Sequence, residues 1–171
     1  MLVLHSLTNH QWNEEAIMSE YYVNFYTYEM NLAGGSPGHV YVGFEERNGS
    51  DILSQSKVGF YPAGELTKEE AIEGKKEGVV KSDNATVHKF EYIRKVSLES
   101  FSKAKEKENE WRAQSKYYKL FESDCVSFAI EIARAVGLNP PRRGISVLTP
   151  DNFIDEVKNE HMEYIKTWLG Q

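Results

Sequence analysis

Cysteine is nearly absent from this sequence, because Cys125 is the only one among 171 residues. A single cysteine cannot form an internal disulfide, so the fold does not require an oxidising compartment, and we expect it to form in the cytoplasm. No apolar run approaches the roughly 20 residues of a membrane-spanning helix. The apolar run at the first residues is also too short for a signal peptide. If the protein acts outside the cell that makes it, we expect delivery by a dedicated secretion system.

Positively charged residues are outnumbered by negatively charged ones. The sequence has 20 lysines and arginines against 26 aspartates and glutamates, so its net charge is −6. Binding to nucleic acid needs clustered basic side chains that neutralise phosphates. We therefore expect no nucleic-acid partner, and the same charge disfavours anionic membrane surfaces. His5 and His10 have no cysteine or aspartate at ligand spacing, so the sequence predicts neither a metal nor a cofactor.

Repeats and low-complexity segments are absent as well, and the hydrophobic content of 40% is ordinary for a globular chain. We expect one domain over residues 1–171, with a polar leader at 1–21 and a long excursion at 62–84. The excursion begins with a short helix at 66–73. The polar stretch after it, 74–78, is expected to be mobile, because loops of this length are usually functional or disordered.

The first half of the chain has the pattern of β-strands. Alternating aromatic and β-branched residues, interrupted by turn residues, predict strands at 22–29, 39–45, 52–61 and 86–96. Asn48-Gly49 is a strong hairpin signal between the second and third of these strands. Successive strands joined in this way predict an antiparallel meander.

The second half has the periodicity of helices, at residues 98–114, 125–136 and from 150 onward. Asp124 is placed to cap the second helix, and Gly137 follows its end. Thr149 is the expected cap of the last helix, with Pro150 in its first turn. A meander followed by separate helices predicts the α+β class, with the antiparallel sheet packed against the helices.

Two reactive side chains stand at the starts of predicted elements. His39 opens the second strand, and Cys125 opens the apolar helix. A histidine base and the amides of a helix start both favour the thiolate, so we predict Cys125 as a nucleophile and His39 as its base. The competing interpretation is that Cys125 is a core residue, as free cysteines often are. The order of the two residues is the reverse of papain and indicates a circular permutation.

A catalytic histidine usually needs a polar partner that fixes its tautomer. The strand after the hairpin offers Gln55, flanked by Ser54 and Ser56, and strand alternation puts Gln55 on the opposite face from the two serines. We favour Gln55, because its amide oxygen can accept a hydrogen bond and its side chain is the longer. Asp83 in the excursion is the charged alternative.

Three stretches of the sequence together resemble a known family: Gly38-His39-Val40-Tyr41-Val42-Gly43-Phe44, Val58-Gly59-Phe60-Tyr61-Pro62, and Tyr118-Lys119-Leu120 leading to Asp124-Cys125-Val126-Ser127-Phe128-Ala129. They resemble the permuted NlpC-type papain-like cysteine amidases and peptidases, a group of bacterial effector-like proteins distantly related to lecithin:retinol acyltransferase-like proteins. The resemblance spans roughly residues 22–155.

This resemblance implies a papain-like fold and cysteine amidase or peptidase activity, with cell-wall peptide as a frequent substrate and secretion-system delivery. By this resemblance, His39 corresponds to the catalytic base of the family and Cys125 to its nucleophile. Asp124 stands where the group has asparagine. An acid there raises the thiol pKa through like-charge repulsion, unless its carboxylate is used to cap the helix.

Two classes of function follow from the sequence. The first is a cysteine hydrolase acting on an amide of a peptide or peptidoglycan, as a toxin with a cognate inhibitor protein, or a related thiol acyltransferase. The second is a catalytically inactive binding or immunity-type protein on the same scaffold, since fold alone does not fix function.

Overall fold

The computed structural model describes residues 19–28, 38–74, 76–84, 90–140 and 149–169, and for 68, 90 and 160–169 it describes the backbone alone. The strands are β1 (Glu20–Tyr28), β2 (His39–Asn48), β3 (Asp51–Pro62), β4 (Lys76–Ser82), β5 (Phe90–Val96) and β6 (Tyr117–Tyr118). The helices are α1 (Lys68–Glu73), α2 (Leu98–Ala113), α3 (Cys125–Ala135) and α4 (Pro150–Leu169). Most of the predicted leader lies outside the described residues.

The strands form one antiparallel sheet in the order β5-β1-β2-β3-β4-β6. The α+β class is confirmed, and β1, β2 and β3 form the predicted meander, which β4 extends at 76–82, where no strand was predicted. β5 does not extend this meander, because it crosses to the opposite edge and pairs with β1. The hairpin signal is also confirmed: Asn48 pairs with Asp51, and Gly49 takes a φ of 59° that favours glycine in a tight turn.

The expectation of a mobile polar stretch at 74–78 is wrong for residues 76–78, which begin strand β4. Gly74 ends α1 with a φ of 70°, and the chain then runs alongside β3. Only Gly78 and Val80 of this strand are buried, so its sequence carries little apolar alternation. Gly78 is needed because a Cβ there would lie 2.0 Å from the Phe60 ring. A strand with a glycine at a buried position does not show the usual pattern.

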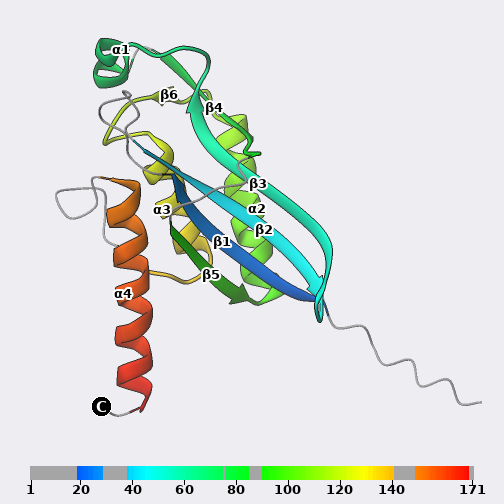
Figure 1. Ribbon diagram of the computed structural model, residues 1–171. Coiled ribbons are helices and arrows are strands. Elements are labelled where there is room, and N and C mark those ends of the chain that lie inside the picture. Colours follow the sequence, from blue (N-terminus) through cyan, green and yellow to red (C-terminus); the bar gives the residue numbers. More distant parts are fainter. Residues whose placement is uncertain (1–18, 29–37, 75, 85–89, 141–148, 170–171) are drawn as a thin grey trace, which may run out of the picture.

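Helices α2, α3 and α4 cover one face of the sheet (Figure 1). Val40, Val42 and Phe44 of β2 point toward them, as the period of two requires. Aromatic rings join the layers at a centroid distance of 4.8 Å between Phe60 and Trp111 and 5.6 Å between Phe25 and Phe153. Within the described part of the chain, no helix is long and apolar enough to cross a membrane.

The opposite face of the sheet carries rings that bear polar groups. Tyr26 and Tyr28 of β1 lie there beside His39 and Tyr41 of β2, because these positions alternate with the core positions of the same strands. The Tyr41 ring lies 4.9 Å from Tyr26 and 5.1 Å from Tyr28, centroid to centroid. Tyr41 is fully buried. Both faces of the central strands are therefore shielded from water.

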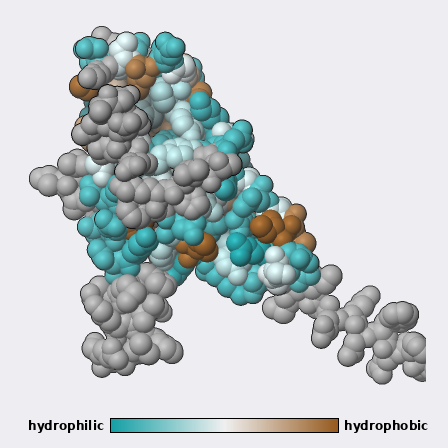
Figure 2. All heavy atoms as spheres, in the orientation of Figure 1, coloured by the Kyte–Doolittle hydropathy of each residue, from teal (hydrophilic) through white to brown (hydrophobic). Residues whose placement is uncertain are grey.

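Exposed large apolar side chains lie at separate places on the described surface, and those of Ile93, Leu98, Tyr117 and Phe121 are among them. Ile52 and Leu53 are exposed where β3 leaves the hairpin, and Ile72 is exposed on α1. Figure 2 shows apolar surface over both regions, separated by polar surface. Exposed apolar residues scattered in this way are normal for a globular protein.

The buried hydroxyl of Tyr41 generates a prediction about stability. Among the described residues it has no hydrogen-bond partner, so the fold bears its desolvation cost without compensation. Tyr41→Phe should leave the free energy of unfolding unchanged or raise it by about 1 kcal/mol, whereas Tyr41→Ala should lower it by about 3 to 5 kcal/mol. Urea denaturation measures both. A clear loss of stability in Tyr41→Phe would show that the hydroxyl has a partner.

Candidate active site

Asp124 fixes the start of α3. Its Oδ1 accepts hydrogen bonds from the Ser127 N–H at 3.0 Å and the Ser127 hydroxyl at 3.1 Å. Its Oδ2 accepts from the N–H of Phe121 at 2.8 Å, and Phe121 has the left-handed φ of 67° in the turn before the helix. The predicted cap is confirmed. One carboxylate thus holds both the first turn of α3 and the turn that leads into it.

Cys125 is the first residue of α3, and its thiol takes part in no disulfide and is 4% exposed. In Figure 1, α3 starts close to the end of the sheet where β2 begins, and the helix contacts β2 and β3. The cysteine is therefore presented at that end of the sheet by a rigid helix. Its side chain also belongs to the apolar core formed with Val126 and Phe128.

His39 occupies the same end of the sheet, at the first position of β2. Its ring stacks on Tyr61 of β3 at 4.2 Å and on Tyr28 of β1 at 5.9 Å, centroid to centroid. The side chain is 12% exposed. Gly59 provides the space for this ring, because a Cβ at position 59 would lie 2.5 Å from the His39 Nε2 atom and 2.8 Å from Tyr61.

Asp83, just after β4, supplies a buried carboxylate next to this histidine. Its side chain is 2% exposed, and its Oδ2 atom lies 4.0 Å from the Nε2 of His39. The Tyr28 hydroxyl donates to Oδ1 at 2.5 Å, and the Tyr61 hydroxyl donates to Oδ2. The backbone N–H of Asp83 donates to the carbonyl of Lys57 at 2.9 Å. The carboxylate thus joins the ends of β1 and β3.

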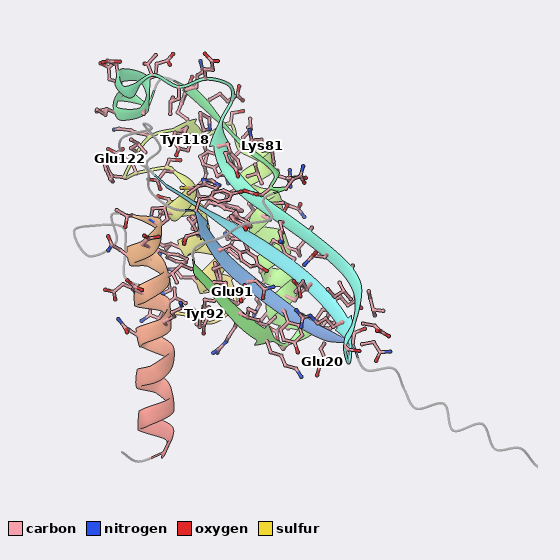
Figure 3. The ribbon with its side chains drawn as sticks, viewed as in Figure 1. Glu20, Lys81, Glu91, Tyr92, Tyr118 and Glu122 are labelled. Carbon is pink, nitrogen blue, oxygen red and sulfur yellow. The ribbon has the colours of Figure 1, made fainter. Side chains whose placement is uncertain are left out.

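Burial controls the ionisation of this cluster. It lowers the pKa of His39 to about 4, even though Asp83 and, more weakly, Asp124 favour the charged imidazolium. Lys81, labelled in Figure 3, also lowers this pKa and lies with its Nζ 4.5 Å from the centroid of the Tyr61 ring. The imidazole is therefore neutral at pH 7, the form that a general base requires.

The two tyrosines that bind Asp83 remain protonated donors. Burial, followed by the hydrogen bond to Asp83, raises the pKa of both Tyr28 and Tyr61 well above the usual range. Cys125 contributes in the same direction to the pKa of Tyr61. The Cys125 thiol therefore lies near enough to Tyr61 for its charge to act weakly on this phenol.

The prediction that Gln55 orients His39 is corrected by the strand register. Gln55 pairs with Glu45 of β2 and donates to its Oε1 at 2.6 Å. Glu45 is six positions from His39 along β2, which is about 20 Å in a strand. Ser54 and Ser56 pair with Glu46 and Phe44 of β2, so they also lie far from His39 along the strand. The residue beside the imidazole is Asp83, the charged alternative.

The hairpin signal contained the information needed to exclude Gln55. Counting outward from the pair Asn48 and Asp51 places position 39 opposite position 60, within one residue of Tyr61. The tyrosines around Asp83 were not predicted as site residues, because their role depends on β4 bringing Asp83 alongside β3. Gly59 carried a weak signal, since a glycine inside a strand often marks a close approach.

The described residues contain no group of three or more His, Cys, Asp or Glu side chains that could hold a metal ion. His5 and His10 lie outside the described residues. A neutral imidazole, a buried carboxylate and a thiol at a helix start are the groups used for nucleophilic catalysis.

Comparison with known proteins identifies no relative: no family model, no curated protein and no solved structure matches this chain.

The burial of His39 predicts an unusual titration. We expect its imidazole to titrate near pH 4, measured by NMR and assigned with His39→Gln. Because the folded pKa lies below the unfolded value of 6.5, the unfolded chain binds the proton first. The free energy of unfolding should therefore fall between pH 6.5 and pH 4, with up to about 3 kcal/mol coming from this group. His39→Gln should flatten that dependence, and a His39 that titrates near 6.5 would contradict the prediction.

Proposed function

We propose that the protein is a cysteine-dependent amide hydrolase in which Cys125 is the nucleophile, His39 the base and Asp83 the acceptor that stabilises the imidazolium. The observation that carries the proposal is the buried neutral imidazole of His39 beside a buried carboxylate, at the end of the sheet where the Cys125 helix begins. Core packing alone gives no reason to bury an imidazole next to a carboxylate, since both are costly to desolvate.

The proposed reaction has two steps. His39 takes the thiol proton, and the thiolate attacks the carbonyl carbon of the amide to give a tetrahedral oxyanion. The imidazolium then donates its proton to the departing amine as the C–N bond breaks, which leaves a thioester on Cys125. A water molecule, deprotonated by His39, hydrolyses the thioester, and the acid leaves as the thiol is restored. The helix start orients the backbone N–H of Cys125 as a candidate oxyanion donor.

The proposed substrates are peptides, in particular the stem peptides of peptidoglycan. This choice rests on the resemblance to permuted NlpC-type papain-like enzymes, in which the histidine strand precedes the cysteine helix, and β2 and α3 follow that order. An exported toxin with a cognate inhibitor protein is the corresponding biological role. A thiol acyltransferase uses the same first step and differs only in the acceptor that resolves the thioester.

A catalytically inactive binding or immunity-type protein is the second candidate. The observation that favours it is the burial of Cys125 within the apolar core. A core thiol is inert, because burial disfavours the thiolate and blocks access to a substrate.

Alkylation of Cys125 separates these two functions. If His39 activates the thiol, iodoacetamide should modify Cys125 at pH 6 faster than it modifies a model thiol, and His39→Gln should slow the reaction at least tenfold. Mass spectrometry of the intact protein follows the reaction of the single cysteine. Equal rates with and without His39 would show that the histidine does not activate the cysteine, and no reaction at all would favour the binding protein.

Purified peptidoglycan sacculi test the substrate class. Incubation with the wild type should release new peptide fragments, resolved by liquid chromatography. Cys125→Ser is the matched control, because it nearly preserves the shape of the side chain, yet a serine hydroxyl is poorly activated where a thiolate is required. Identical chromatograms from wild type, Cys125→Ser and buffer would exclude this substrate and leave other amides or the binding role.

A further inference from the structure

Both oxygens of the Asp83 carboxylate are occupied by tyrosine hydroxyls. Tyr28 donates to Oδ1, and Tyr61 donates to Oδ2. Oδ2 is also the oxygen that faces the Nε2 of His39, at 4.0 Å. That separation exceeds a hydrogen bond, so the histidine and the aspartate are neighbours that are not bonded to each other.

In this arrangement, one nitrogen of the His39 imidazole lacks a hydrogen-bond partner among the described residues. That nitrogen is Nε2, and it is buried. A buried polar atom without a partner is costly, and such atoms are rare in folded proteins. The Tyr61 ring stacks on the imidazole at 4.2 Å, so the same side chain covers the ring and occupies the oxygen that would accept from it.

We propose that Tyr61 is a positioning residue whose hydroxyl competes with the His39 imidazole for Oδ2 of Asp83, which holds the site in a resting arrangement. This inference rests on the proposed function for the role of His39. When Cys125 gives up its proton, the imidazolium needs an acceptor. The Tyr61 hydroxyl then yields Oδ2, and the Nε2–H of His39 donates to it.

Several charged or titratable groups act on His39 from the surrounding elements. The rings of Tyr28 in β1 and Tyr61 in β3 stack on the imidazole. The charges that act on its pKa are those of Asp83, Lys81 and Asp124, from the residue after β4, from β4 and from the residue before α3. Asp83 is the carboxylate nearest the imidazole in this set. Asp124 is committed to Phe121 and Ser127, so Asp83 is the acceptor whose availability Tyr61 controls.

Tyr61→Phe tests the competition, because it removes the hydroxyl and keeps the ring that stacks on His39. We expect the pKa of His39, followed by NMR, to rise by about one unit, as for a charge partner that comes within bonding distance. The acidic limb of Cys125 alkylation against pH should move with it. Tyr28→Phe frees Oδ1, whereas the oxygen that lies 4.0 Å from the Nε2 of His39 is Oδ2, so this variant should produce less than half of that shift.

Tyr41→Phe is the matched control. It removes a buried hydroxyl from the same face of the sheet, and that hydroxyl has no hydrogen-bond partner among the described residues. The pKa of His39 should be unchanged in this variant. Asp83→Asn is the second variant, needed if Tyr61→Phe does not fold. It should lower the pKa of His39, because the favourable charge is lost.

An unchanged His39 titration in Tyr61→Phe, or a larger shift in Tyr28→Phe, would overturn the proposal. No effect of Asp83→Asn would overturn it as well, because the carboxylate would then not act on His39. If Cys125 proves unreactive in every variant, the hydrolase function fails, whereas the NMR titration still decides whether Tyr61 withholds Asp83 from His39.

Discussion

The buried carboxylate of Asp83 is the interaction on which the end of the sheet depends. It receives hydroxyl hydrogen bonds from β1 and β3, and its own backbone N–H is bonded to β3. A desolvated carboxylate is unfavourable unless such donors surround it. The two tyrosines that meet this requirement are also the two rings between which His39 is stacked. The position of the imidazole and the burial of the charge therefore follow from one set of contacts.

On the helix side of the candidate site, a buried aspartate again fixes the local structure through its hydrogen bonds. Asp124 uses both of its oxygens to fix the turn before α3 and the first turn of the helix, so Cys125 lies on a backbone that is held on either side. Two buried aspartates thus organise the two halves of the candidate site. Asp83 positions the ring on the sheet, and Asp124 positions the thiol on the helix. Rigid support of this kind is what the proposed base and nucleophile require, because small displacements of reacting groups cost much of the rate.

Local signals in the sequence predicted the local structure well. Asn48-Gly49 marked the hairpin, and the caps at Asp124 and Thr149 marked two helix starts, since each depends on residues a few positions apart. β4 was missed because its buried positions are a glycine and a valine among lysines and a glutamate. Asp83 was undervalued for the same reason, because its proximity to His39 exists only once β4 pairs with β3. The class of the fold was predictable, whereas the third member of the site depended on a pairing across distant segments.

Gly59 links these contacts to how such a scaffold changes over evolution. The space above it is filled by the His39 ring and Tyr61, and both are stacked against each other, so neither is free to move aside. A single added methyl group at this position would displace the imidazole without changing the identity of His39, Asp83 or Cys125. The scaffold is therefore one substitution away from a protein in which the imidazole has been displaced from its place between Tyr61 and Asp83.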